Sequence, residues 1–287
     1  MNEPTPSAAK RLIQWLKPVY FSGQRLIART LFAYSPGALE SAIRSLGIGA
    51  GDSILMHSAF RRVSGFRGTP GDVIECLLNV IGPGGHLLMM SIPYRGSSQR
   101  YAEGDPLFDA LRTPSAVGLI SEVFRRREGV LRSLNPLHPV LACGPLAAWL
   151  IADHEKCAYS CGKGSPFERF LNLDGMLLFF DAPYSSLTFM HYVEDRFRDQ
   201  LPVELYDPQP VTLRIKEACG RERQVRQFVF SQAARARRHF APIERALRRE
   251  GMIQTLRIGN TRLLSVSARS VVDCAGLLIR QGAGFYT

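Results

Sequence analysis

The sequence lacks a hydrophobic run long enough to cross a membrane, since a spanning helix requires roughly 20 consecutive apolar residues. Its N-terminus also lacks the apolar segment and the small-residue cleavage site of a secretory signal. We therefore expect a cytoplasmic protein. With 46% hydrophobic and 21% charged residues among 287, the chain can bury one large core or two of ordinary size.

Cysteine is scarce and scattered. The six cysteines form no C-x-x-C pair, and a chain of this length needs no disulfides to hold its core, so we expect free thiols. His154, Cys157 and Cys161 lie close together in the sequence, but a fourth ligand at the spacing typical of zinc sites is missing. We therefore expect no metal.

Acidic residues are in deficit, because 25 Asp and Glu stand against 36 Lys and Arg and leave a net charge of +11. Such a surface attracts anions, including phosphates, CoA, nucleic acids and acidic lipid headgroups. Residues 8–34 contain no acid, and their basic residues are interleaved with apolar ones. We expect residues 1–34 to be a basic amphipathic extension, which either contacts the inner membrane surface peripherally or packs on the protein itself or on a second subunit.

Short apolar runs bounded by glycine mark the strands of a folded domain. We expect buried strands at 53–56, 85–90, 140–142 and 176–180. Residues 72–81 have the apolar spacing of a helix, so the first two strands and this helix predict a parallel unit. Residues 211–215 and 224–230 fit a hairpin around Gly220. The sequence thus predicts an α/β fold, a three-layer αβα core with a mixed sheet and an antiparallel hairpin addition.

A second basic stretch, Arg235–Arg249, predicts helices on either side of Pro242. Nucleic-acid-binding helices have this composition, but neither a run of stacking aromatics nor a helix-turn-helix spacing accompanies it. We therefore expect no nucleic-acid partner.

Two stretches carry motifs of a known family. The first, Arg132–Gly144, reads RSLNPLHPVLACG and resembles the pattern R-S-x-H-P-x-x-S-x-x-A-x-G of the aminoglycoside 3-N-acetyltransferases. The second begins with GKGSPF at 162–167, similar to the family's G-E-x-S-P, and ends with TFMHYVE at 188–194, similar to T-x-x-H-x-x-E. Shorter matches in the same order extend the resemblance over residues 36–280.

The resemblance implies that residues 35–287 form an acyltransferase domain, which moves an acetyl group from acetyl-CoA to an amine. Such a reaction needs a base that takes the proton of the amine and donors that stabilise the tetrahedral oxyanion. The family's histidine falls at Asn135 in this sequence, its serine at Pro139 and its glutamate at Lys163. Asparagine accepts no proton at neutral pH, so the chain departs from its family at the base.

His138, three residues further along the same loop, is therefore the predicted base, the alternative being a structural histidine bonded to a loop carbonyl. Asn135 is expected to donate to the oxyanion or to the substrate. His191 and Glu194 match the family pattern and would share one helix face. Glu194 is expected to orient His138, to hold the amine, or to pair with a nearby arginine.

The cofactor site is expected at the C-terminal end of the strand at 53–56, where ligands bind in open α/β sheets. The serine and glycines before the helix at Asp72 are expected to receive the pyrophosphate of CoA, and Gly118 to let the pantetheine arm approach the backbone. The predicted CoA contacts are His57, Ser58, Ser64, Gly65, Thr113, Gly118, Arg132 and Ser133.

We therefore expect direct, general-base transfer of an acetyl or other acyl group from acyl-CoA to the amine of an amino-sugar-like acceptor. The positive net charge favours an anionic acceptor, such as a nucleotide-activated or lipid-linked amino sugar of polysaccharide biosynthesis, over a polycationic aminoglycoside. Two alternatives stay open: a re-purposed, non-catalytic CoA-binding protein, and an enzyme of aminoglycoside resistance.

Overall fold

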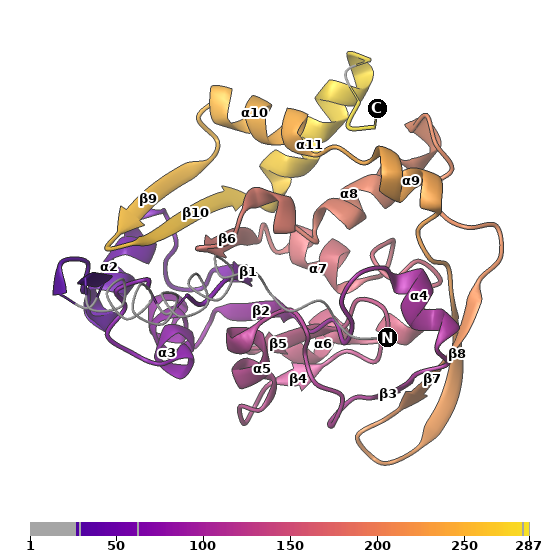
Figure 1. Ribbon diagram of the computed structural model, residues 1–287, viewed down its shortest axis with the longest axis horizontal. Helices are drawn as coiled ribbons and strands as arrows, with labels where there is room; N and C mark the ends of the chain where they lie inside the picture. The colour runs from indigo at the N-terminus through magenta and orange to yellow at the C-terminus, as the bar shows by residue number, and fades with distance from the viewer. Residues whose placement is uncertain (1–26, 29, 62, 283, 287) are drawn as a thin grey trace, which may run out of the picture.

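The computed structural model describes residues 27–28, 30–61, 63–282 and 284–286 (Figure 1). Most of the predicted N-terminal extension therefore lies outside the described residues, and the boundary at residues 34 and 35 stays a prediction. Within the described ranges, none of the helices combines the length and apolarity needed to span a membrane. Nor does that part of the chain gather three or more His, Cys, Asp or Glu side chains that could hold a metal ion.

The main sheet has the strand order β4-β5-β2-β1-β6-β10-β9. Its strands are β1 (Ser53–Ser58), β2 (His86–Met90), β4 (Leu131–Arg132), β5 (Val140–Cys143), β6 (Met176–Phe180), β9 (Gln254–Ile258) and β10 (Thr261–Ser267). β1 pairs in parallel with both β2 and β6, whereas β5 and β10 run antiparallel to their neighbours. The predicted mixed sheet is confirmed, and its parallel strands lie at its centre.

Helices cover both faces of this sheet, because successive side chains of a buried strand point to opposite sides (Figure 1). Ile54 and Met56 pack with α2 (Pro36–Ser45), α3 (Pro70–Ile81) and α5 (Leu119–Arg125). Leu55 packs on the other face. The helices of that face are α6 (Ala147–Ile151), α7 (Pro166–Asn172), α8 (Met190–Arg196), α10 (Ala241–Arg249) and α11 (Ala268–Arg280). The three-layer core is thus confirmed.

The predicted hairpin forms a second, smaller sheet. β7 (Val211–Lys216) pairs antiparallel with β8 (Glu222–Gln227), and β3 (Leu107–Asp109) adds to β7 in parallel. Leu137, from the loop between β4 and β5, is fully buried in the core of this sheet. The loop that carries the first family motif is therefore held between the two sheets.

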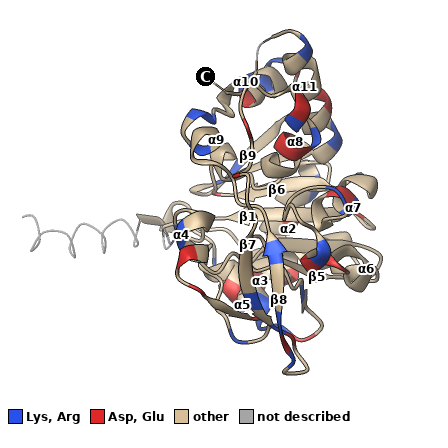
Figure 2. Ribbon diagram, turned by 90° about the vertical axis from the view of Figure 1, so that its right-hand side faces the viewer, with Lys and Arg blue, Asp and Glu red and all other residues tan. Residues whose placement is uncertain are grey.

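The basic stretch around Pro242 forms α9 (Gln232–Arg237) and α10, as predicted, and α4 (Ser98–Glu103) contacts β7 of the second sheet. In the basic stretch itself, arginine side chains are paired with acidic side chains. Arg248 pairs with Glu244 at 2.8 Å, and Arg249 with Glu250 at 2.9 Å. Figure 2 shows acidic and basic residues interspersed over α8, α10 and α11.

Candidate active site

A hollow opens at the carboxyl-terminal ends of the parallel strands of the main sheet. β1 and β6 are in register, with Ser58 beside Phe180, so their carboxyl ends meet. This hollow, which we call the edge hollow, has a volume of about 260 Å³. It is lined by Met56, His57, Ser58, Ala59, Met90, Val117, Ser121, Ala182, Pro183, Ser186 and Thr188. Open α/β sheets bind ligands at this edge.

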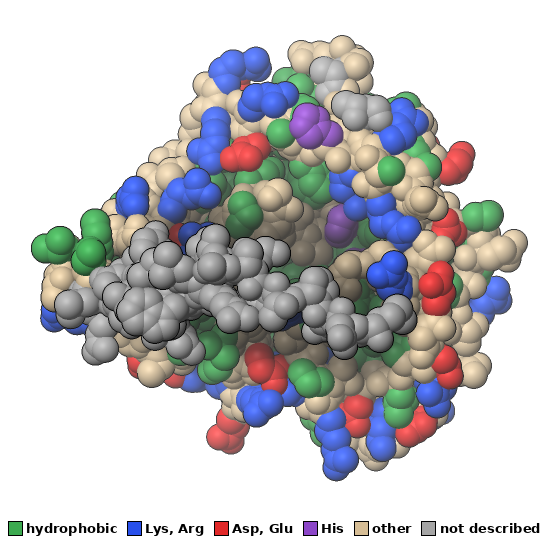
Figure 3. All heavy atoms as spheres, viewed as in Figure 1, with side chains coloured by type: hydrophobic (Ala, Val, Ile, Leu, Met, Phe, Trp, Pro, Cys, Tyr) green, Lys and Arg blue, Asp and Glu red, His purple; other side chains and the backbone are tan. Residues whose placement is uncertain are grey.

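A second hollow, of about 490 Å³, adjoins the first, since Ser186 and Thr188 line both. We call it the α8 hollow, because His191 of α8 lines it together with Arg238 and Phe240. Figure 3 shows this face of the molecule hollowed in the middle, with apolar side chains inside and a histidine and Lys or Arg side chains at the margin. His191 therefore lines the hollow that adjoins the ends of the parallel strands.

His191 and Glu194 form a histidine–carboxylate pair. They are three residues apart on α8, which places them on one face, and His191 Nδ1 lies 2.8 Å from Glu194 Oε2. The other carboxylate oxygen, Oε1, accepts from Arg238 Nε at 2.7 Å and from the Tyr286 hydroxyl. The Glu194 side chain is 0% exposed, whereas that of His191 is 20% exposed. The carboxylate is thus locked, and the imidazole remains accessible.

The protonation states of this pair follow from burial and neighbouring charge. Burial alone would raise the pKa of Glu194, but the hydrogen bond and charge of His191, with the charge of Arg238, hold it below its ordinary value. Burial lowers the pKa of His191, Arg238 lowers it further, and Glu194 offsets these effects in part. His191 is therefore neutral at pH 7. Its Nδ1–H donates to the carboxylate, which leaves Nε2 as a proton acceptor.

Asn135 folds the motif loop rather than facing the substrate. Its side-chain oxygen accepts from the backbone N–H groups of Leu137 at 3.0 Å and His138 at 2.9 Å, and its Nδ2 donates to the carbonyl of His154 at 3.2 Å. The residue is 0% exposed. Its predicted role as a donor to the oxyanion is wrong, because the amide is enclosed and committed to the backbone.

His138 lies beside His191, with ring centroids 5.6 Å apart, but it has no carboxylate partner among the described residues. Its Nδ1 is 2.6 Å from Ser160 Oγ. Burial lowers its pKa well below the ordinary value, and the charges of His191, His154 and Arg238 lower it further. The prediction that Glu194 orients His138 is wrong, since Glu194 contacts His191.

Arg132 and Ser133 organise the wall of the site. The guanidinium of Arg132 donates to the carbonyls of Thr113 at 2.6 Å and Ser91 at 2.8 Å, and it stacks on Phe108. Ser133, 1% exposed, accepts from the backbone of Val140 and bonds a buried histidine. Both side chains are engaged by the protein, and their contacts with CoA stay predictions.

That buried histidine is His154, one of the three residues weighed above as metal ligands. Its Nε2 donates to the carbonyl of Ser160 at 2.6 Å, and its Nδ1 accepts from the Ser133 hydroxyl at 2.8 Å. Both nitrogens are thus satisfied by the protein. Thr113, whose Oγ1 accepts from the backbone of Asp109 at 2.8 Å, is likewise part of the wall.

Ser64 and Gly65 do not line either hollow. They are buried, and a side chain at Gly65 would collide with the backbone of Phe32. The N-terminus of α3 is closed by its own capping box, in which Asp72 accepts from the N–H of Thr69 at 2.7 Å. The Asp72 carboxylate already lies at the positive end of the helix, so the structure does not support the predicted pyrophosphate contacts, which stay predictions.

His57, Ser58 and Gly118 lie close together at the carboxyl end of β1. His57 and Ser58 line it, and the Nε2 atom of His57 accepts from the backbone of Thr188 at 3.0 Å. Burial lowers the pKa of His57 to about 4, offset in part by the carbonyl of Leu55. Gly118 lies against the carbonyl of Ser58, with φ at 153°, a conformation that glycine alone adopts easily.

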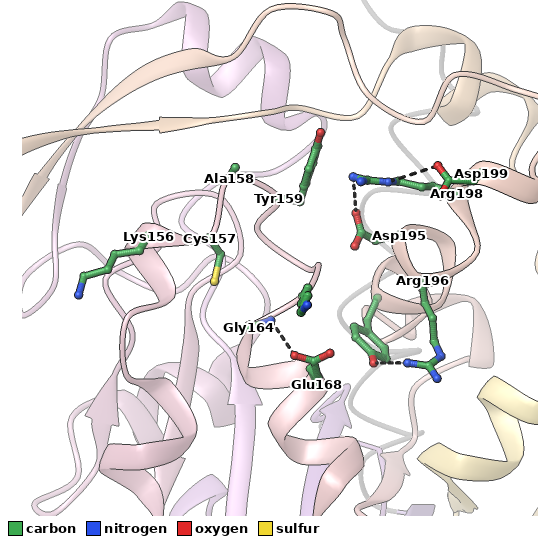
Figure 4. Close-up of a pocket in the computed structure, with 12 residues that line it drawn as sticks. Lys156, Cys157, Ala158, Tyr159, Gly164, Glu168, Asp195, Arg196, Arg198 and Asp199 are labelled. Carbon is green, nitrogen blue, oxygen red and sulfur yellow. Dashed lines mark hydrogen bonds and ion pairs between the residues drawn. The ribbon is translucent and has the colours of Figure 1, made fainter.

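A larger hollow, of about 660 Å³, lies beside α8 and contains no predicted site residue. Figure 4 shows several of its charged side chains engaged by neighbours, Arg198 by Asp195 and Asp199, Arg196 by a tyrosine hydroxyl, and Glu168 by the backbone of Gly164. Histidine is absent from the side chains that line it. It therefore lacks a neutral base comparable to His191.

Three residues of the site escaped the sequence analysis as contributors to chemistry, namely Ser160, Arg238 and Tyr286. Arg238 was noticed only as part of a basic stretch, and neither Ser160 nor Tyr286 belongs to a motif. Arg238 and Tyr286 reach Glu194 across 44 and 92 residues of sequence. Only the tertiary fold brings them together.

Comparison with known proteins gives the same family from sequence and from structure. The model of the family described as aminoglycoside 3-N-acetyltransferase matches residues 55–279. An aminoglycoside N(3)-acetyltransferase III of Acinetobacter baumannii is 31% identical over 169 residues, which cover 55% of this chain and 59% of that protein. A type VIII enzyme of Streptomyces fradiae is 27% identical over 217 residues, covering 70% of this chain and 75% of the relative.

Solved structures agree with the fold. The binary complex of AAC-IIIb with CoA superposes with a TM-score of 0.71 at 24% identity, covering 88% of this chain and 99% of that chain. A mutant of the aminoglycoside acetyltransferase AAC(3)-IVa in complex with a gentamicin gives 0.73 at 25% identity, covering 88% and 92%. The chain therefore belongs to the aminoglycoside 3-N-acetyltransferase family.

Proposed function

We propose that this protein transfers an acetyl group from acetyl-CoA to the amine of an amino-sugar-like acceptor, with His191 as the general base. The observation that supports the proposal is the His191–Glu194 pair, whose His191 lines the α8 hollow next to the edge hollow and has one imidazole nitrogen without a partner among the described residues. A neutral histidine oriented by a carboxylate is suited to take a proton near pH 7.

In this mechanism the amine nitrogen attacks the thioester carbon, and the π electrons of the carbonyl move to its oxygen. His191 Nε2 takes the proton that the nitrogen loses, while Glu194 stabilises the imidazolium that forms. The oxyanion then collapses, the carbon–sulfur bond breaks, and the CoA thiolate receives the proton. Cys161 does not carry the acyl group, because it is 0% exposed and burial raises its pKa well above the ordinary value.

The edge hollow is the proposed place of the pantetheine arm. Its volume of about 260 Å³ suits such an arm rather than a whole CoA molecule, and Gly118 lets the arm run close to the backbone of Ser58. His57 and Ser58 would contact it, as the sequence predicts. Support comes from the related AAC-IIIb, which was solved with CoA.

For the acceptor we propose an amino sugar that carries negative charge, such as one used in polysaccharide or nucleotide-sugar modification. The net charge is +11, and Arg238 lines the α8 hollow. Its positive charge would favour a phosphate or carboxylate on an acceptor bound there. The acid that lines the same hollow, Glu244, is engaged by Arg248.

An aminoglycoside acceptor is the second candidate, favoured by the relatives. They are named aminoglycoside acetyltransferases, and the AAC(3)-IVa and AAC-VIa structures hold a gentamicin, apramycin or sisomicin. The chain aligns with only 59% of the first curated relative, so this acceptor too is a proposal.

A panel of acceptors tests the proposal. The protein would be mixed with acetyl-CoA and with glucosamine 6-phosphate, a UDP-linked amino sugar or sisomicin, and thiol release and product mass would be measured. We expect kcat/KM to be highest for a phosphorylated amine. Preference for sisomicin by more than about tenfold, or about 1.4 kcal/mol, would select the second candidate.

No transfer to any amine, with CoA still raising the thermal midpoint, would instead support the non-catalytic alternative. The cytoplasmic location and the membrane-surface contact of residues 8–34 stay predictions from composition. Co-sedimentation with anionic vesicles tests the latter.

A further inference from the structure

His138 has an unusual combination of contacts for a buried histidine. Its ring meets His191 edge-on at 5.6 Å and Phe230 at 6.0 Å, and Nδ1 bonds Ser160. Its other nitrogen, Nε2, has no hydrogen-bond partner in the described chain, and protein atoms do not fully enclose it. One imidazole nitrogen is therefore held by the protein and the other is open.

The serine decides which nitrogen carries the hydrogen. Ser160 is 2% exposed, and His138 Nδ1 is the only nitrogen or oxygen partner of its hydroxyl among the described residues. If Nδ1 carried the hydrogen, the buried serine O–H would be left without an oxygen or nitrogen acceptor, which is unfavourable. The remaining neighbour is the thiol of Cys161, which burial keeps protonated and which accepts only weakly.

Ser160 therefore donates to Nδ1, and the open Nε2 carries the hydrogen. The backbone of Ser160 is itself fixed, because its carbonyl accepts from His154 Nε2 at 2.6 Å. The N–H of His138 is in turn fixed by Asn135, at 2.9 Å. Asn135, which stands where the family has its histidine, thus fixes the backbone of His138.

We propose that His138 is an oxyanion-binding residue of the acetyl transfer, which Ser160 holds in the Nε2–H tautomer. This inference rests on the proposed function, and it replaces the predicted role of His138 as base. His191 accepts the proton of the amine through its bare Nε2, and His138 donates a hydrogen bond to the carbonyl oxygen as that oxygen becomes negative. His138 keeps its proton throughout, so the balance of the reaction is unchanged.

The different partners of the two histidines divide the two roles. A carboxylate on Nδ1 of His191 stabilises the imidazolium, as a base requires. A hydroxyl donor on Nδ1 of His138, together with burial and the nearby charge of Arg238, keeps that imidazole neutral and makes it a donor. The ring centroids lie 5.6 Å apart, so the two imidazoles are direct neighbours.

The first test reads the tautomer directly in the whole protein. Long-range 1H–15N spectra of histidine-labelled protein, with His138→Gln used to assign the signal, are expected to show an unprotonated Nδ1 and a protonated Nε2. Ser160→Ala should convert this signal to a mixture of tautomers. A protonated Nδ1 in the parent protein would overturn the proposal, whether or not the protein transfers acetyl groups.

The second test separates kcat from KM, with acetyl-CoA and the best amine of the panel above. His138→Ala should lower kcat by about 100-fold or more with little change in the KM for acetyl-CoA, and His138→Gln, which retains an N–H donor, should recover part of the loss. Ser160→Ala should fall between them. The acid limb of the pH profile should persist in all three, because it belongs to His191.

The matched control is His86→Gln, since His86 also bonds a serine through Nδ1 but lies at the opposite edge of the sheet. The kcat of His86→Gln should stay within about twofold of the parent, because a substitution far from the reacting groups does not couple to them. A His138→Ala variant that is folded and turns over at the parental rate would overturn the inference. If the parent protein transfers no acetyl group to any amine, the proposed function is contradicted. The spectra would still show which tautomer His138 adopts.

Discussion

The two ends of the parallel strands hold similar histidine–serine pairs with different surroundings. At the amino ends of β1 and β2, His86 Nδ1 lies 3.0 Å from Ser53 Oγ, and its Nε2 is enclosed without a partner among the described residues. Beyond the carboxyl end of β2, His138 makes the same contact with Ser160, but its Nε2 is open and His191 lies beside it. The place in the sheet, rather than the pair itself, gives a histidine its chemistry.

The largest expected effect comes from removing the base at the carboxyl edge. We expect His191→Ala to lower kcat by about 1,000-fold, and Glu194→Gln by about 100-fold, because the first removes the proton acceptor and the second its partner. Steady-state thiol release measures both. His86→Gln, which replaces an imidazole at the amino ends of the strands, should again have a kcat close to that of the parent. Equal losses in His86→Gln and His191→Ala would mean that both act only through stability.

Acid should weaken the folded state through the buried histidines. Burial lowers the pKa of His57 and of His154 to about 4, whereas in the unfolded chain these groups protonate near 6.5. Unfolding therefore takes up protons between these pH values, so stability rises with pH across this window and is lost as pH falls through it.

From pH 7 to pH 5 each of these histidines should lower the free energy of unfolding by about 2 kcal/mol. Urea unfolding at both pH values measures the loss. His57→Gln should show a smaller decline than the parent. A free energy of unfolding that is independent of pH over this range would contradict the assigned neutral states.

Arg238 sharpens the difference between the two edges by keeping His191 neutral. Its charge lowers the pKa of His191, after the larger effect of burial. Arg238→Met should therefore move the acid limb of kcat/KM to higher pH, so that the rate at pH 6 falls relative to the rate at pH 8. Phosphorylated acceptors should also lose more than neutral ones. An unmoved limb would show that Arg238 does not face the imidazole electrostatically.

The smallest effect is expected at Gly118. A methyl group there would lie 3.6 Å from the carbonyl of Ser58, an ordinary contact, but φ at 153° strains an alanine. We expect Gly118→Ala to raise the KM for acetyl-CoA by about threefold, since the strain is on the order of 1 kcal/mol. Gly220→Ala, at a positive φ on the tip of the β7–β8 hairpin, is the control and should leave this KM unchanged.

The core was predictable because burial leaves a local pattern. The apolar runs at 53–56 and 176–180 became β1 and β6, and Ser35 caps α2 by accepting from the backbone of Ala38 at 3.2 Å. The β9–β10 hairpin was missed, although its Gly259-Asn260 turn is a hairpin signal, because β9 is largely exposed and carries no apolar run.

The site was predictable only in part. Sequence spacing placed His191 and Glu194 on one helix face, and the strand end placed His57 and Ser58 at a ligand edge. Spacing could not show that Asn135 is consumed by its own loop, because that depends on where the loop folds back. Nor could it show the contacts that hold Glu194, which come from distant segments.

A crystal structure of the protein with acetyl-CoA tests the central claim most directly. The account predicts that the pantetheine arm lies in the edge hollow, with the thioester carbon between His191 and His138 and its oxygen facing His138 Nε2. A thioester bound in the larger hollow beside Tyr159 and Glu168, or turned away from His191, would contradict it.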